Sequence, residues 1–84
     1  MTLVERAKSV HTREDLEDLV KALIVDLKDN PGAWENADLD SFLDAMLACV
    51  RTMESYYRNV GESLEELPPW RILADLLMAS RIYE

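Results

Sequence analysis

LDSFLDAMLACVRTMESYYRN, residues 39–59, is the stretch that decides the fold class. Its apolar residues recur at the three- and four-residue spacing of an amphipathic helix. They form two stripes. The first is Leu39, Phe42, Leu43, Met46, Leu47, Val50 and Met53, and the second is Ala45, Cys49, Tyr56 and Val60. A helix at the surface of a domain needs one apolar stripe, so two stripes predict neighbours on two sides.

Residues on either side of this stretch indicate where the helix begins and ends. Asp38 precedes it, and a carboxylate at that position accepts hydrogen bonds from the unpaired N–H groups of the first turn. Gly61 follows it, and glycine readily adopts the left-handed conformation that ends many helices. We therefore predict one long helix over Leu39–Asn59.

A second predicted helix, Arg13–Lys28, comes earlier in the chain. Thr12 and Asp15 have the spacing of a capping box at its start, and an Asn-Pro-Gly run follows its end. Its apolar stripe is Leu16, Leu19, Val20, Leu23, Ile24 and Leu27. Thr2 and Glu5 repeat the capping-box spacing, so a short extra N-terminal helical turn is also expected.

The third predicted helix, Pro69–Tyr83, opens on a proline, which a first helical turn tolerates. One of its faces is polar at Arg71 and Asp75 and then becomes apolar at Met78 and Ile82, so the last two turns are apolar nearly all round. Exposed apolar surface of this kind commonly marks a binding surface. Met78 and Ile82 are therefore the candidate self-association residues.

The length and composition indicate one small globular domain. The 84 residues include only two glycines, which argues against a turn-rich β fold, and the apolar fraction of 49% is that of a globular protein. We predict a single helical domain over residues 1–84. Its class is all-α, and its architecture is a small three-helix bundle with the extra N-terminal turn.

The charge balance restricts the partners of this chain. Nine basic residues against 17 acidic ones give a net charge of −8, which argues against nucleic-acid binding because phosphate contacts need Lys and Arg. A basic surface on a protein partner is compatible with this charge. The sequence has no apolar run long enough to span a membrane and no signal-peptide pattern, so a cytoplasmic location is expected.

The sequence contains no catalytic motif, and we expect no enzyme activity, cofactor or metal site. Cys49 is the only cysteine and His11 the only histidine, so neither a disulfide nor a Cys/His zinc site is expected. Two carboxylate pairs have the i,i+4 spacing from which oxygen ligands reach a hard cation. They are Glu14/Asp18 and Asp40/Asp44. A solvated acidic face is the more common explanation for such pairs.

Aromatic, amide and arginine side chains at the helix ends are the best candidates for partner binding. Tyr, Trp and Arg dominate protein interfaces. The candidate partner-binding residues are Tyr56, Tyr57, Arg58, Asn59, Trp70 and Arg71. The alternative is local packing of these rings in the turn between the second and third helices. Trp34 and Asn36 fall at the other end of the long helix, so two clusters are expected instead of one pocket.

Four short motifs occur in a characteristic order along the chain. They are Trp-Glu-Asn at 34–36, Tyr-Tyr-Arg-Asn-Val-Gly-Glu at 56–62, Pro-Trp-Arg-Ile-Leu-Ala-Asp at 69–75 and Ala-Ser-Arg-Ile-Tyr-Glu at 79–84. Together they resemble a family of small acidic bacterial helical proteins known only as a domain of unknown function. Cys49 and Ser55 depart from the aromatic and the glycine expected there. The resemblance implies no activity.

Three functions are compatible with these features. The first is a non-enzymatic protein–protein interaction module, for example an immunity-like inhibitor that covers a basic toxin surface, by analogy with other small acidic proteins. The second is a structural or regulatory homodimer, which the apolar end of the third helix favours. The third, an enzyme that uses carboxylates and a divalent metal, has the least support.

Overall fold

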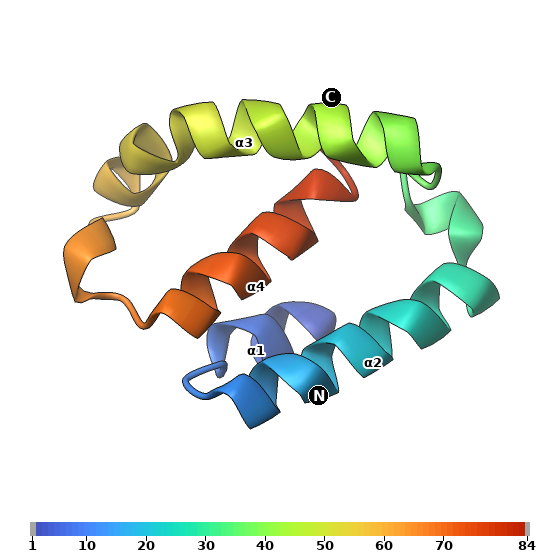
Figure 1. Cartoon of the computed structure of the whole chain (residues 1–84), viewed down its shortest axis with the longest axis horizontal. Helices are drawn as coiled ribbons and strands as arrows, with labels where there is room; N and C mark the ends of the chain where they lie inside the picture. Colours follow the sequence, from blue (N-terminus) through green and yellow to red (C-terminus); the bar gives the residue numbers. More distant parts are fainter. Residues whose placement is uncertain (1, 84) are drawn as a thin grey trace.

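The computed structural model describes residues 2–83, and every regular element in that range is helical (Figure 1). The elements are α1 (Leu3–Lys8), α2 (Arg13–Asp29), the 3-10 turn η1 (Pro31–Ala33), α3 (Leu39–Asn59), the 3-10 turn η2 (Leu64–Glu66) and α4 (Pro69–Ser80). The predicted all-α class and the three long helices are confirmed. The extra N-terminal turn is a short helix, α1.

Side-chain caps explain where the helices begin. At α2, the Thr12 hydroxyl accepts from the backbone N–H of Asp15 at 3.1 Å, and the Asp15 carboxylate accepts from the backbone N–H of Thr12 at 3.3 Å. At α3, Asp38 accepts from the backbone N–H of Ser41 at 2.9 Å. These bonds favour the ionised carboxylates, so the pKa values of both aspartates are lowered, that of Asp15 chiefly by the backbone N–H of His11.

The helices α3 and α4 end for different structural reasons. Gly61 has φ of 78° and the N–H of Glu62 donates to the carbonyl of Tyr57 at 2.8 Å, which is the left-handed stop predicted for α3. By contrast, α4 ends at Ser80, three residues before the predicted end. The side-chain amide of Asn36 donates to the carbonyl oxygens of Ser80 at 3.0 Å and Tyr83 at 2.6 Å, so these carbonyls are paired without a further helical turn.

The central element is α4, which contacts α1, α2 and α3 (Figure 1). By contrast, α3 chiefly contacts α4 and η2, and α2 lies on the other side of α4. The predicted three-helix bundle is not confirmed, because α2 and α3 share no substantial contact. The central position of α4 explains why its last turns are apolar nearly all round.

The core lies where the N-terminal segment, α2 and α4 meet. Its buried residues are Ala7, Val10, Leu16, Leu19, Leu23 and Ala74. On α3 the buried residues are Ala45, Cys49 and Tyr57. Of the second predicted stripe, Ala45 and Cys49 are therefore covered, whereas Tyr56 and Val60 are exposed. The first stripe is half-buried at Phe42, Met46 and Met53 and exposed at its other four positions. The expectation of neighbours on two sides is wrong within this chain, because α2 does not reach α3. None of the helices in residues 2–83 combines the length and apolarity that a membrane crossing needs.

Candidate functional site

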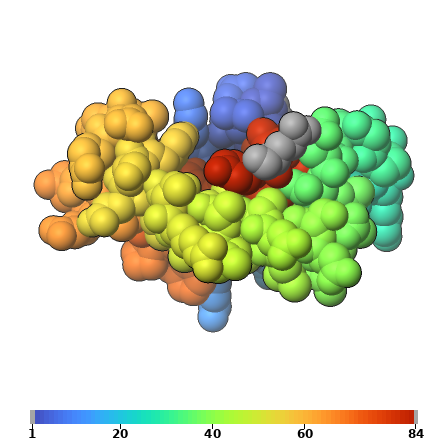
Figure 2. Space-filling view, turned by 90° about the horizontal axis from the view of Figure 1, so that it is seen from above, coloured from blue at the N-terminus to red at the C-terminus, as the bar shows by residue number. Residues whose placement is uncertain are grey.

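An open groove of about 620 Å³ runs along α4 between α1 and α3. Figure 2 shows the C-terminal part of α4, in red, recessed between α1 in blue and α3 in yellow-green. The apolar residues that line it are Val4 and Ala7 of α1, Cys49, Met53, Tyr56 and Tyr57 of α3, Val60 just after it, and Leu76, Met78, Ala79, Ile82 and Tyr83 of α4 and its end. The groove is therefore an apolar surface with two helical walls.

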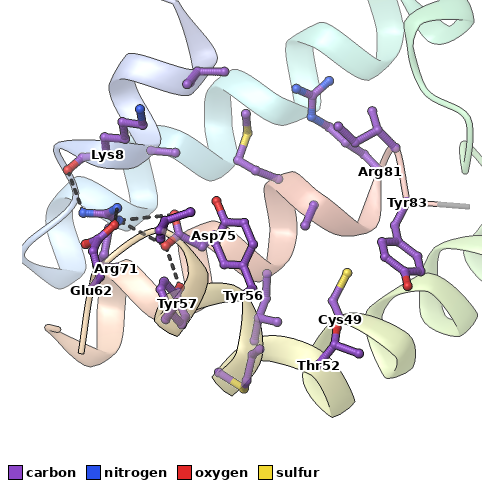
Figure 3. A pocket seen from close by; sticks show the side chains of 18 residues that line it. Lys8, Cys49, Thr52, Tyr56, Tyr57, Glu62, Arg71, Asp75, Arg81 and Tyr83 are labelled. Carbon is purple, nitrogen blue, oxygen red and sulfur yellow. Dashed lines mark hydrogen bonds and ion pairs between the residues drawn. The ribbon is translucent and has the colours of Figure 1, made fainter. Parts of the chain in front are cut away.

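Arg71 holds the elements together at one end of this groove (Figure 3). Its Nε donates to both carboxylate oxygens of Asp75, at 3.2 and 3.1 Å, and its Nη2 lies 3.5 Å from a carboxylate oxygen of Glu62. Its Nη1 donates to the carbonyl oxygen of Lys8, at the end of α1, at 3.4 Å. The planar guanidinium reaches all three partners at once, which the single ammonium of a lysine would not do.

Tyr57 adds a fourth contact to this polar end. Its hydroxyl donates to Asp75 Oδ2 at 2.6 Å, which ties α3 to α4. Burial raises the pKa of Tyr57 far above its ordinary value, and the hydrogen bond to Asp75 and the negative charge of that carboxylate add to the effect. The phenol therefore stays protonated and donating throughout the neutral range.

Cys49 lies in the middle of the groove wall, where α3 faces α4. Its thiol is buried, as predicted, and burial raises its pKa above the ordinary value. A hydrogen bond with Ser80 opposes this rise. Because the thiolate is the reactive form of cysteine, this side chain contributes apolar surface and not nucleophilic chemistry.

The structure divides the predicted partner-binding residues. Tyr56, Tyr57 and Arg71 line the groove, whereas Arg58 and Asn59 are exposed on α3 outside it, and Trp70 does not line it either. Tyr57 and Arg71 already have partners within the chain. Tyr56 is 58% exposed, and its ring meets that of Tyr57 edge-on at 5.3 Å. It is thus an accessible aromatic side chain of the groove, as is Tyr83, which is 42% exposed.

The predicted self-association residues lie in the same groove. Met78 is half-buried and packs against the core, and Ile82 is half-exposed. Glu62 and Lys8 belong to the polar end of the groove but were not among the predicted site residues. The i,i+4 spacing of Arg71 and Asp75 was the one local signal for it, and no sequence pattern indicates that the carbonyl oxygen of Lys8 completes it.

Trp34 and Asn36 lie before α3 and do not line the groove, but they contact two residues that do, Arg81 and Tyr83. The indole N–H of Trp34 donates to the carboxylate of Asp26 at 2.8 Å, and its ring stacks on Phe42 at 6.4 Å. The guanidinium of Arg81 lies 5.9 Å from the ring centre. Trp34 also packs against the core, where it closes one end of it.

The groove is suited to binding by its chemistry. It offers apolar contacts, two exposed aromatic rings, Tyr56 and Tyr83, and two half-buried methionines, Met53 and Met78. Arg71 is paired with Glu62 and Asp75 at one end of the groove, and Arg81 also lines it. Among residues 2–83, His, Cys, Asp and Glu side chains do not gather in groups of three that could hold a metal ion. The groove therefore offers a partner molecule an apolar contact surface.

These features define a small, acidic, all-α protein with an open apolar groove. The chain belongs to the family of unknown function DUF7660, whose family model matches residues 12–84. The match includes α2, α3 and α4 and begins after α1, the helix that forms one wall of the groove. A search of curated proteins found no match, and a search of solved structures found none either.

Proposed function

We propose that this protein is a non-enzymatic protein–protein interaction module whose groove receives an apolar helical segment of a basic partner. The observation that carries the proposal is the exposed ring of Tyr56 at the edge of an open apolar groove. Tyrosine is among the residues that contribute most to binding energy at interfaces. A large exposed aromatic beside an apolar groove is what such a binding surface requires.

The shape of the groove supports a helical ligand. It has walls from α1 and α3 and a floor from α4, and amphipathic helices bind in apolar grooves of this kind. Met53 and Met78 lie along it, and methionine side chains adapt their conformation to different ligands. The ligand would present an apolar stripe to the groove and polar side chains to solvent.

The charge of the protein supports a basic partner. A net charge of −8 attracts Lys- and Arg-rich surfaces and speeds their association. An immunity-like inhibitor that covers a basic toxin surface is one form of this proposal. A structural or regulatory homodimer is the second candidate function, and the exposed stripe of α3 favours it. No observation in residues 2–83 favours a carboxylate/metal enzyme, and we do not propose one.

A designed peptide tests the groove directly. The probe is a Leu–Lys amphipathic peptide of about 18 residues, which forms about five helical turns, and a Leu–Glu peptide of the same pattern is its counterpart. We expect the Leu–Lys peptide to shift the amide resonances of groove residues and the Leu–Glu peptide to bind more weakly. Tyr56→Ser should weaken binding about tenfold.

Two variants of equal size and charge control this experiment. Ala79→Phe places a ring in the groove and should block the peptide, whereas Ala33→Phe, on the exposed η1 turn, should leave binding unchanged. Resonance shifts spread over the acidic surface of α2, with no effect of Ala79→Phe in a folded protein, would contradict the proposal.

A cellular experiment tests whether the groove has a natural partner. A photoreactive side chain in place of Tyr56 should cross-link one protein in the native host, and one in place of Val25 on α2, which is 56% exposed, should not. Ala79→Phe should abolish the adduct at position 56. The same adducts from both positions would show that the capture is unspecific.

A further inference from the structure

The first apolar stripe of α3 forms an exposed surface. Leu39 is 71% exposed, Leu43 51%, Leu47 50% and Val50 46%. With 3.6 residues per turn, the last three lie roughly 100–160° around the helix from Cys49, which is buried on the side of α3 that faces α4. None of the four lines the groove. They form a separate face, which we call the outer face of α3.

The surface area of the chain is larger than a monomer of this mass requires. Its accessible surface is 5742 Å² for 9.7 kDa. The scaling of surface with mass gives about 5100 Å² for a folded monomer, so the excess is roughly 600 Å². The molecule is also flat, with extents of 34 × 26 × 17 Å. A specific dimer of standard size buries about 600–1,000 Å² on each partner, so the excess is comparable with the lower end of what one subunit of such a dimer would cover.

Four charged residues lie beside the outer face, namely Asp40, Asp44, Arg51 and Glu54, and one opposite pair among them, Asp40 and Arg51, is placed so that it can pair across a two-fold axis. Asp40 lies at one end of the stripe and Arg51 at the other, about 16 Å apart along the helix. Both are exposed, and neither forms an ion pair with another side chain in residues 2–83. When two α3 helices run antiparallel about a point near Ala45 and Met46, Asp40 of each comes level with Arg51 of the other.

We infer that the outer face of α3 is the interface of a symmetric homodimer. In it, the α3 helices of two copies pack antiparallel through Leu43, Leu47 and Val50, and Asp40 of each subunit pairs with Arg51 of the other. A two-fold axis makes each contact twice, as such interfaces require. This inference rests on the second candidate function, the homodimer, and specifies its interface; it is independent of the peptide-binding proposal, since the interface leaves both grooves open. It also uses a different surface from Met78 and Ile82.

The mass of the protein in solution tests this interface. We expect sedimentation equilibrium at micromolar concentration to give twice the mass of the chain, and Leu47→Glu to give a monomer with an unchanged circular dichroism spectrum. Val25→Glu changes an equally exposed residue on α2 and should leave the dimer intact. A wild-type protein with the mass of one chain would overturn the inference, as would dimers that Leu47→Glu leaves intact and Ile82→Glu dissociates.

Charge reversal tests the antiparallel arrangement. Asp40→Arg alone places two Arg–Arg contacts across the two-fold axis, and Arg51→Asp alone places two Asp–Asp contacts, so each should weaken the dimer about tenfold. The double variant restores opposite charges and should recover the wild-type dissociation constant. A double variant no tighter than either single variant would overturn this pairing. The peptide should still bind in the groove of the monomeric Leu47→Glu variant, which separates this test from that of the proposed function.

Discussion

Tyr56 and Tyr57 are neighbours in sequence but lie in different environments. Successive residues of a helix point about 100° apart, so Tyr57 turns toward α4 and binds Asp75 while Tyr56 stays exposed at the groove. Both were predicted to be partner-binding residues. Only the structure assigns Tyr57 to holding the helices together and Tyr56 to the accessible surface.

The hydroxyl of Tyr57 should contribute measurably to stability. Tyr57→Phe keeps the ring but removes the hydrogen bond to the Asp75 carboxylate. We expect the free energy of unfolding at pH 7 to fall by about 1.5–3 kcal/mol, the range for hydrogen bonds to charged groups. Urea denaturation of the two proteins measures the difference. An unchanged midpoint would contradict it.

The same pair of proteins should differ in alkaline solution. The folded-state pKa of Tyr57 is raised above the unfolded value of about 10. Its contribution is therefore complete below pH about 10 and is lost as the pH rises toward the folded-state pKa. The stability difference between wild type and Tyr57→Phe should narrow above pH about 10, and a difference that stays constant there would contradict this assignment.

Leu23 and Leu47 test which stripes form the core. Both were expected to be buried, but Leu23 is buried in α2 whereas Leu47 is half-exposed on α3. Leu23→Ala should destabilise by about 2–5 kcal/mol. Leu47→Ala should change the stability of the monomer by about 0.5 kcal/mol or less, measured at concentrations low enough to dissociate the inferred dimer. Equal losses in the two variants would show that Leu47 is covered within the monomer.

At the scale of the elements, residues next to a helix predicted its boundaries accurately. A boundary that depends on a residue far away in the sequence was not predicted. Asp38 and Gly61 act on their own helix, and α3 has the predicted bounds. The end of α4 depends on Asn36, which lies 44 and 47 positions away from the residues it binds. No pattern along the chain connects them, so the predicted helix was three residues too long.

The candidate site shows the same division between local and distant information. Periodicity identified both stripes of α3, but it does not specify which of them a neighbour covers. That depends on the packing order, with α4 between α3 and α2. The groove forms because α1 and α3 both pack against α4. No pattern along the sequence indicates which helices pack against each other.

The two glycines of the chain, Gly61 after α3 and Gly32 in η1, test how α3 ends. Gly61 has φ of 78°, which L residues rarely adopt, and an added Cβ would meet no atom within 4 Å. Gly61→Ala should therefore destabilise through backbone strain alone, by about 1–2 kcal/mol. Gly32 also has open space and needs no positive φ, so Gly32→Ala is the matched control and should be neutral or slightly stabilising. Equal effects of the two substitutions would contradict this account.

At the scale of the whole molecule, stability depends on the central position of α4. Ala74 is fully buried there, in the core shared with α2 and the N-terminal segment. Ala74→Leu would push these elements apart and should destabilise by about 1–3 kcal/mol, which lowers the melting temperature by about 4–8 °C per kcal/mol in a domain of this size. Ala33→Leu, on the exposed η1 turn, should leave the melting temperature unchanged.

The wall of the groove that α1 forms has a kinetic consequence. A six-residue helix is not stable by itself, and α1 depends on its packing through Leu3, Ala7 and Val10 and on the contact of Arg71 with the carbonyl oxygen of Lys8. Because it has no stability of its own, α1 should undock at a lower free energy than α4 unfolds. Hydrogen exchange at the amides of Ser9 and Val10 should therefore be faster than in the middle of α4.

Undocking of α1 would also set the lifetime of the groove. Each event removes one of its two walls, so a ligand that contacts Val4 would bind only the docked population and slow the exchange of the α1 amides. If the amides of α1 exchange as slowly as those of α4, then α1 stays docked and the groove keeps both of its walls. If the α1 amides exchange faster than those of α4, then α1 undocks from the fold. The rate at which α1 docks again then limits how quickly a bound ligand becomes enclosed.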